Sequence, residues 1–188
     1  MSIFIKLMEK FQNFSESGEV MTLEERGVVH SKGLWHQSAQ VYLFNEHGDL
    51  LIQQRSDQKD LYAGLWDDSV GEHLRPRESF RDGALRGLYE ELQVEGIDIH
   101  EFGETDRSDF SYGELTDREF KQAFFGIFRG MVRPDPIEVQ SISWVGKRDF
   151  IKLTNYSRQA FCPPLLMDVV RLDLLNRWDK IVDWLIEV

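Results

Sequence analysis

Short apolar runs separated by turn residues dominate the first half of the chain and predict β-strands. Residues 11–21 indicate a small hairpin, and a capping box at residues 22–25 should start a short helix. Strand-like runs at residues 40–45 and 50–55 flank a polar cluster in which Gly48 favours a turn. We therefore expect an N-terminal arm, followed by a β-hairpin that opens the main fold.

Residues 79–92 separate apolar and charged side chains onto two sides of a predicted helix. The apolar side should anchor this helix while its acids face a cleft. Gly83 and Gly87 each weaken a helix by about 1 kcal/mol relative to alanine, so they either admit close packing or mark drift after a lost constraint. Drift is the simpler interpretation. The apolar arc comprises Ala84, Leu85, Leu88 and Leu92, and the polar side comprises Arg86, Glu90 and Glu91.

The second half of the chain predicts strands and then helices. Pro163 and Pro164 stop one segment and can open the next, and apolar residues then recur at helical spacing, so one long or two shorter helices should close the chain. The predicted strands are residues 97–110, 118–129 and 139–145. The predicted organisation is an arm at residues 1–35, a main domain at residues 36–155 and a helical extension at residues 156–188 that packs on the same domain.

Length and composition favour one domain with a core of its own, because 41% of the 188 residues are hydrophobic. The net charge of −11 argues against a nucleic-acid partner, which needs surplus Lys and Arg. A single cysteine, Cys162, excludes an internal disulfide. Residues 1–8 are too short for a signal or a membrane span, so we expect a soluble, cytoplasmic protein without a membrane partner.

Residues 72–94 carry the acids that cleavage of a pyrophosphate requires. Such cleavage needs neutralised phosphate charge and an activated water, tasks suited to Mg²⁺ held by carboxylates. The segment resembles the Nudix box, but Glu72 stands for its first glycine, Gly87 for its first helix glutamate and Gln93 for its closing glycine. The residues that keep the box pattern are Glu78, Arg86, Leu88, Glu90, Glu91 and Val94.

Roughly residues 11–150 resemble the Nudix subgroup related to isopentenyl-diphosphate isomerase. In that subgroup a catalytic cysteine stands two residues before a metal-binding histidine. Here the histidine is His73 and the nucleophile position is Gly71, which argues against isomerase chemistry. His30 and His36 resemble two further isomerase histidines, although His30 is one residue out of register, and both can equally be structural. The resemblance outside the box rests on residues 30–36, 42–45, 53–55, 59, 64–67 and 69–70.

The resemblance also implies a set of site residues. Glu119, in the Asp117-Arg-Glu-Phe120 stretch, would lie where the family places strand acids, unless strand alternation turns it to solvent. Glu91 or Glu119 would act as the general base. Outside the family context, the helix acids could be a solvated face and the cations ordinary turn residues. The implied metal ligands are Glu90, Glu91 and Glu119, the phosphate contacts Arg55 and Lys59, the supporting residues Glu78 and Arg86, and the additional candidates Glu72, His73 and His36.

The implied fold is α/β: a Nudix-type α/β/α sandwich with a mixed, curved β-sheet and an added C-terminal helical segment. The implied function is Mg²⁺-dependent hydrolysis of a diphosphate linkage in a small molecule, such as a nucleoside diphosphate derivative, with Mn²⁺ as the alternative ion. A degenerate module that binds a nucleotide or sugar diphosphate without cleaving it is the second hypothesis, motivated by Gly87 and Gln93. Isomerisation of isopentenyl diphosphate is the third. The C-terminal helices could cover their own core or a second subunit in a homodimer.

Overall fold

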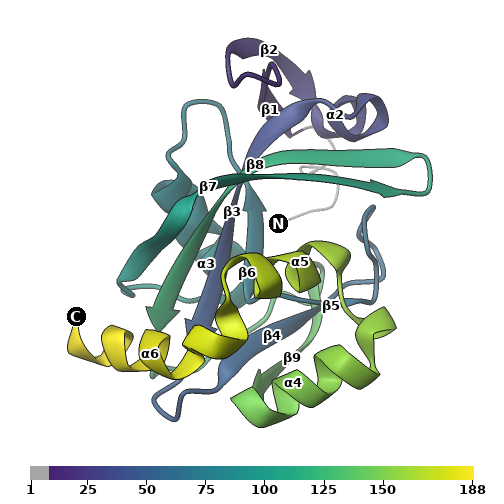
Figure 1. The fold of residues 1–188 in the computed structure, drawn as a ribbon. Helices are drawn as coiled ribbons and strands as arrows, with labels where there is room; N and C mark the ends of the chain where they lie inside the picture. Colours follow the sequence, from purple (N-terminus) through teal and green to yellow (C-terminus); the bar gives the residue numbers. More distant parts are fainter. Residues whose placement is uncertain (1–8) are drawn as a thin grey trace.

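A mixed sheet of nine strands lies between helices in the computed structural model, which describes residues 9–188 (Figure 1). The expectation for residues 1–8 lies outside the described residues. The strands are β1 (Lys10–Phe14), β2 (Val20–Glu25), β3 (Trp35–Phe44), β4 (Leu50–Arg55), β5 (Trp66–Asp67), β6 (Val70–His73), β7 (Ile99–Tyr112), β8 (Leu115–Ile127) and β9 (Val139–Val145). The helices are α2 (Arg26–Lys32), α3 (Phe80–Leu92), α4 (Lys147–Tyr156), the 3-10 turn η1 (Arg158–Ala160), α5 (Pro163–Arg171) and α6 (Leu174–Glu187).

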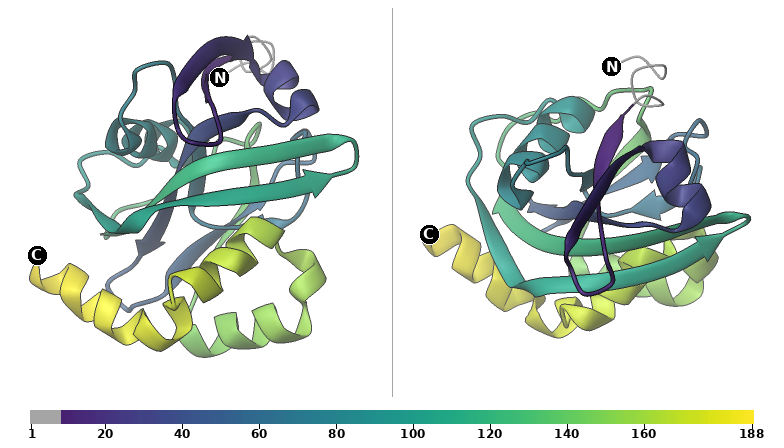
Figure 2. Two further views of the ribbon diagram at one scale, coloured as in Figure 1. Left: turned by 45° about the horizontal axis from the view of Figure 1, so that its top comes forward. Right: turned by 90° about the horizontal axis from the view of Figure 1, so that it is seen from above.

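The central strand of the sheet is β3. It runs parallel to β8 and antiparallel to β6, so segments far apart in the sequence meet along it. The β7–β8 hairpin crosses the molecule between the N-terminal arm and the C-terminal helices (Figure 2). This arrangement confirms the predicted α/β sandwich.

Alternation along the strands gives the sheet two apolar faces. On β3, Val41 and Leu43 face α3, whereas Tyr42 and Phe44 face the C-terminal helices. Because both faces are covered, all four side chains are fully buried. The two helices predicted to close the chain are present as α5 and α6, and they cover the chain's own core together with α4. Among residues 9–188, none of the helices has the length and apolar character that crossing a membrane requires.

The helix predicted to start at residues 22–25 was misplaced. These residues continue β2, where Leu23 pairs with Gln12 and Glu24 with Phe11 across the hairpin. Strand pairing therefore outcompetes the capping box, and α2 begins only at Arg26, without a side-chain cap. The helix that carries the Nudix-like box was predicted correctly, and Ser79 caps it by accepting a hydrogen bond from the Asp82 amide.

Gly87 marks the closest approach of α3 to β6. A Cβ atom placed on Gly87 would lie 2.7 Å from Cγ1 of Val70, a separation that real Cβ atoms essentially never show. A Cβ on Gly83 would lie 3.1 Å from a methyl group of Leu74. Both glycines thus serve close packing, and the interpretation of drift was wrong.

Candidate functional site

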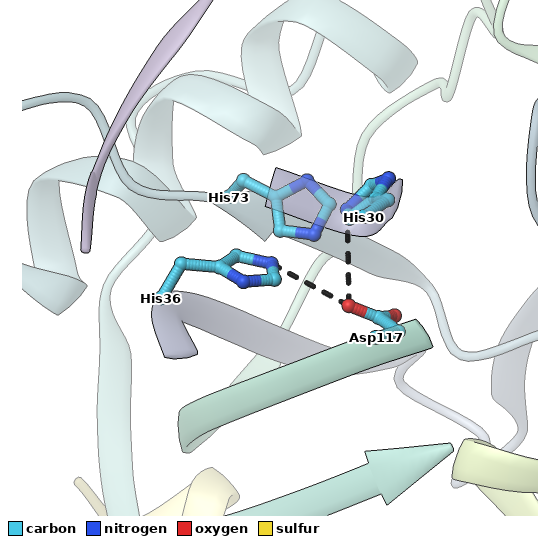
Figure 3. Close-up of side chains that lie close together, drawn as sticks. All are labelled: His30, His36, His73 and Asp117. Atoms are coloured by element: carbon cyan, nitrogen blue, oxygen red, sulfur yellow. Dashed lines mark ion pairs between the residues drawn. The ribbon is translucent and has the colours of Figure 1, made fainter. Parts of the chain in front are cut away.

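Three imidazoles and a carboxylate converge at one end of β3 (Figure 3). They belong to His30 on α2, His36 on β3, His73 on β6 and Asp117 on β8, and their ligand atoms all lie within 4.8 Å of one another. Oδ1 of Asp117 is 3.4 Å from Nε2 of His36 and 3.8 Å from Nε2 of His30. Within residues 9–188, no other group of three or more His, Cys, Asp or Glu side chains is gathered closely enough to hold a metal ion. We call these four residues the histidine centre.

The sheet register produces this convergence. Across β3, His36 stands opposite Glu119 of β8, and Ser38 stands opposite His73 of β6. Gly33 ends α2 in the left-handed conformation, with φ of 58°, and turns the chain directly into β3. That turn brings His30, near the end of the helix, against His36, near the start of the strand, with ring centroids 5.4 Å apart.

Burial sets the charge state of the centre. It lowers the pKa of His36 to about 4 and that of His73 well below its ordinary value. Burial also raises the pKa of Asp117, an effect to which the neighbouring Glu119 carboxylate adds. Neutral imidazole is the form that binds metal ions, and near neutral pH both of these histidines are in that form.

Several buried atoms of the centre lack hydrogen bonds. Nε2 of His30, Nε2 of His36 and Oδ1 of Asp117 find no hydrogen-bond partner among the described residues. A buried polar atom without a partner costs about 1–3 kcal/mol, and three of them facing one another need a common explanation. A divalent cation would engage all three at once, so these residues fit a metal ion.

Glu119 adjoins the histidine centre and is buried, so the alternative that it faces solvent is wrong. Its carboxylate accepts hydrogen bonds from His73 Nε2, at 3.3 Å, and from Ser108 Oγ, at 3.2 Å. Burial disfavours the charged carboxylate, but the hydrogen bond from His73 and the nearby imidazoles outweigh it and lower the pKa of Glu119. The strand acid predicted from the sequence therefore lies beside the imidazoles.

Arg26 and Asp60 contact the Nδ1 atoms of His73 and His30, respectively. Neither residue was singled out in the sequence analysis. Arg26 donates to Nδ1 of His73 at 2.9 Å and pairs with both oxygens of Asp60. Asp60 also lies 3.2 Å from Nδ1 of His30. A carboxylate at the outer nitrogen, as Asp60 is for His30, fixes the orientation and tautomer of metal-binding histidines. The Arg26 guanidinium at Nδ1 of His73 instead leaves the proton on Nε2, which donates a hydrogen bond to Glu119.

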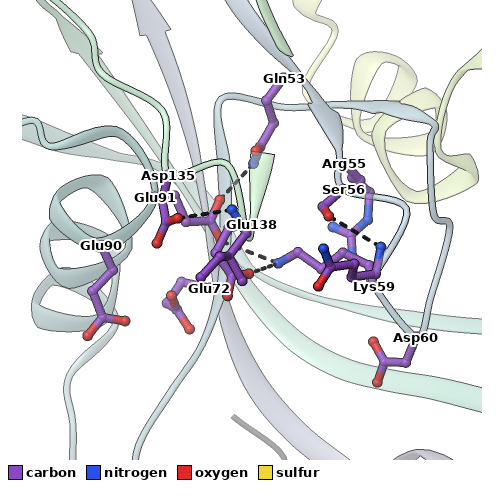
Figure 4. Close-up of polar contacts among 12 residues, drawn as sticks. Gln53, Arg55, Ser56, Lys59, Asp60, Glu72, Glu90, Glu91, Asp135 and Glu138 are labelled. Carbon is purple, nitrogen blue, oxygen red and sulfur yellow. Dashed lines mark hydrogen bonds and ion pairs between the residues drawn. The ribbon is translucent and has the colours of Figure 1, made fainter. Parts of the chain in front are cut away.

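The acids of α3 separate instead of forming one cluster (Figure 4). Glu91 is buried, accepts a hydrogen bond from Gln53 at 2.9 Å and lies 3.7 Å from the Lys59 ammonium. Glu90 points away from Glu91 and pairs with Arg75 and Arg86. Consecutive helix residues are about 100° apart, which explains why neighbours in the sequence face different sides.

Arg86 joins the helix to the segment before it. Its guanidinium makes two contacts of 2.8 Å with Glu78 and donates to the His73 carbonyl at 2.8 Å. It also lies 3.1 Å from Glu72 and 3.3 Å from Glu90, the ion pair expected from their spacing. The motif residues Glu78 and Arg86 therefore position α3 against β6.

A polar cavity of about 660 Å³, counting its mouth, opens beside the histidine centre. The predicted phosphate contacts Arg55 and Lys59 line it, but each already pairs with a carboxylate. Arg55 donates to Asp67 at 3.1 Å, and Lys59 lies 2.5 Å from Glu138. Other lining residues are Arg26, Gly71, Glu72, His73, Glu91 and Glu119. The structure thus brings Glu91 and Glu119 to one cavity, whereas Glu90 is not among its lining residues.

The sequence missed Asp117, Asp60, Arg26 and Glu138 as site residues. A signal existed only for Asp117, because it stands two positions before Glu119 and residues at that spacing share a strand face. The other three lie on segments whose approach depends on the tertiary fold.

Comparisons with known proteins agree with this architecture. The family model described as NUDIX domain matches residues 34–162. The isopentenyl-diphosphate Delta-isomerase of Serratia proteamaculans is 31% identical over 160 residues, which cover 81% of this chain and 86% of the relative. That of Streptomyces coelicolor is 33% identical over 133 residues, covering 69% and 67%.

Solved structures show the same fold. DR0079 from Deinococcus radiodurans superposes with a TM-score of 0.69 at 21% identity, covering 87% of this chain and 99% of that one. The MutT protein from Methanosarcina mazei superposes with a TM-score of 0.57 at 23% identity, covering 78% and 94%.

Proposed function

The chain belongs to the NUDIX domain family, and we propose that it is a metal-dependent hydrolase that cleaves a diphosphate linkage in a small molecule. One observation carries the proposal. The unpartnered ligand atoms of His30, His36 and Asp117 face one another beside a cavity lined by both carboxylates and cations. A diphosphate needs both kinds of group, because its negative charge must be neutralised while a water is activated.

The histidine centre, with Glu119, would hold one divalent ion. Imidazole nitrogens suit first-row transition metals, whereas carboxylates suit Mn²⁺ as well as Mg²⁺. We propose Mn²⁺ for this centre because its ligands combine imidazoles with carboxylates. Glu91 would hold Mg²⁺ at the cavity wall, since carboxylates suit that ion. Bound divalent ions supply charge neutralisation for the phosphates.

Side chains of the protein would bind the phosphates and accept the proton of the attacking water. Arg26, Arg55 and Lys59 line the cavity and would bind and orient the phosphate oxygens. Glu91 would accept the proton of the attacking water. We prefer Glu91 to Glu119 for this role because His73 and Ser108 contact both oxygens of Glu119 at 3.2–3.3 Å, whereas Oε1 of Glu91 lies 3.7 Å from the Lys59 ammonium, beyond hydrogen-bond distance.

The substrate class we propose is a nucleoside diphosphate derivative. The cavity beside the histidine centre is lined by the cations Arg26, Arg55 and Lys59, which suit the anionic diphosphate of such a compound. The net charge of −11 disfavours a polymeric phosphate backbone as substrate.

The test is chromatographic detection of the two phosphomonoester products from a panel of nucleoside diphosphate derivatives, with and without Mg²⁺ and Mn²⁺. We expect metal-dependent turnover in wild type and a loss of about 100-fold or more in Glu91→Gln, the range typical of losing a general base. Glu95→Gln, an exposed carboxylate just after α3, is the matched control. Equal turnover in Glu91→Gln and wild type would remove Glu91 from the mechanism. Absence of turnover on every compound would leave the binding module as the better hypothesis.

The names of the relatives favour a second candidate, isomerisation of isopentenyl diphosphate. Against it, Gly71 lines the cavity at the position of the isomerase cysteine, and the only cysteine of the chain, Cys162, is buried in the core. Product analysis after incubation with isopentenyl diphosphate separates the two chemistries, because isomerisation leaves the diphosphate linkage intact.

A further inference from the structure

Glu72 occupies the space that a side chain at position 87 would need. A Cβ atom placed on Gly87 would lie 2.8 Å from Cβ and 3.2 Å from Cγ of Glu72. The two residues come from different elements, Glu72 from β6 and Gly87 from α3. A side chain that leaves the strand at position 72 therefore reaches the volume that one leaving the helix at position 87 would fill.

That volume adjoins Glu91 along α3. Position 87 lies four residues before Glu91, and residues at this spacing are neighbours on one helix face. The Nudix box places a glycine at position 72 and a glutamate at position 87, and this chain carries the two residue types exchanged. The exchange keeps one carboxylate and one glycine at the same contact between strand and helix.

We propose that Glu72 supplies from β6 the metal-binding carboxylate that position 87 of the helix does not provide. The inference rests on the proposed function, since it assigns a ligand to the ion held by Glu91. Glu72 is 3% exposed and lines the same cavity as Glu91 and Glu119. Two other residues of that cavity wall have a buried oxygen, Gln40 Oε1 and Asp68 Oδ1, that accepts no hydrogen bond from the described residues. The wall therefore offers acceptors that a cation or a donor can engage.

Arg86 positions Glu72 and also provides the means to test it. Its guanidinium lies 3.1 Å from Glu72, but its closer pair is with Glu78, at 2.8 Å through two contacts. Glu78 is not among the residues that line the cavity. If Glu72 served only to hold Arg86, removal of the Glu78 charge would disturb the site at least as much as removal of the Glu72 charge.

The experiment is calorimetric titration of Mg²⁺ into the full chain in the presence of methylenediphosphonate. One equivalent of Co²⁺ is bound first, because it prefers the imidazoles of the histidine centre. We expect Glu72→Gln to weaken Mg²⁺ binding about tenfold or more, since ligand charge sets the affinity of oxygen-rich sites. Glu78→Gln should weaken it less than Glu72→Gln does, because Glu78 acts only through Arg86 and does not line the cavity. Equal loss in both variants, or no loss in Glu72→Gln, would overturn the assignment.

A second experiment places the carboxylate at position 87 of the helix. On a Val70→Ala background, which removes the methyl group 2.7 Å from the Cβ position of residue 87, Glu72→Gly should lose Mg²⁺ affinity and Glu72→Gly with Gly87→Glu should regain it. Circular dichroism confirms that each variant is folded. Failure of the folded exchange variant to regain affinity contradicts the inference.

The titration and the turnover assay fail independently. Wild-type hydrolysis together with unchanged Mg²⁺ affinity in Glu72→Gln would overturn the role of Glu72 and leave the proposed function standing. Mg²⁺ binding that depends on Glu72, without any turnover, would support the ligand and overturn the hydrolase. Absence of Mg²⁺ binding in wild type would overturn the ligand assignment directly.

Discussion

His36 on β3 lies directly opposite Glu119 on β8, within a parallel register that runs unbroken from Trp35 to Phe44. Side chains alternate between the two faces of a strand, so a slip of one residue would turn His36 away from the other imidazoles. The geometry of the histidine centre therefore depends on pairing between two strands separated by about 80 positions in the sequence. Ligand residues alone do not specify it.

Metal binding should stabilise the fold through Asp117. Its Oδ1 faces the imidazoles of His30 and His36, and an ion bound only by the folded state raises stability by about 3 kcal/mol at 100 times its dissociation constant. We expect Mn²⁺ to raise the melting temperature of wild type and EDTA to reverse the rise. Asp117→Asn should show a much smaller rise. An equal rise in this variant would show that Mn²⁺ binds elsewhere.

Stability of the metal-free protein should fall as the pH drops from about 6.5 to about 4 because of His36. Its pKa is about 4 in the folded state, below the ordinary value of 6.5. Between these pH values His36 binds a proton in the unfolded chain but not in the folded chain. Acid therefore lowers the free energy of unfolding by a total of about 3 kcal/mol. Below pH 4 this contribution to the pH dependence ends.

Urea unfolding of wild type and His36→Gln across this pH range measures the effect. The difference between their free energies of unfolding should change with pH, whereas His47→Gln, which removes an exposed histidine, should track wild type. A pH-independent difference between wild type and His36→Gln would mean that this imidazole does not titrate as described.

The pattern of hydrophobic and polar residues predicted most of the helices and strands, because each segment shows its own pattern without reference to the rest of the chain. Helical spacing of Ala84, Leu88 and Leu92 located α3, and short apolar runs bounded by turn residues located β4, β8 and β9 to within a few residues. The error at residues 22–25 arose where two local signals competed. A capping box and a strand edge both suit this stretch, and pairing with β1 decided between them.

The site was predictable only where it coincides with a linear motif. Glu91 and Arg86 follow from the box, and Glu119 follows from its family position. Arg26 and Asp60, in contrast, reach the imidazoles from segments 34 residues apart, and no pattern along the chain brings them together. Their roles depend on the packing of the N-terminal arm against the loop after β4.

A buried ion pair should anchor the C-terminal helices to the sheet. Lys121 on β8 and Asp168 on α5 are 2.6 Å apart and nearly inaccessible to solvent. Tyr42 and Arg171 donate two further contacts to Asp168. Removal of one partner from such a pair costs about 3–5 kcal/mol because the other charge remains buried. We expect this loss of unfolding free energy for Asp168→Leu in a urea titration.

The double variant Lys121→Met with Asp168→Leu tests the cause. The double variant removes the lysine that Asp168→Leu leaves buried without its closest partner, so it should be more stable than Asp168→Leu alone. Lys121→Met is measured separately. If the losses of unfolding free energy in Lys121→Met and Asp168→Leu simply add in the double variant, the ion pair is not the reason for the loss.

Lys59 should compete with divalent cations for the carboxylates of the cavity. Its ammonium lies 2.5 Å from Glu138 and 3.7 Å from Glu91, so it neutralises acids that a metal ion would otherwise engage. Lys59→Met should therefore bind Mg²⁺ more tightly in the absence of any phosphate compound. The same variant should have a higher KM for a diphosphate substrate, because one phosphate-binding cation is lost.

Lys147→Met, which removes a lysine that pairs with Asp179 outside the cavity, should leave both the Mg²⁺ affinity and the KM near wild type. Weaker Mg²⁺ binding in Lys59→Met would show that the lysine organises these carboxylates and does not compete for them.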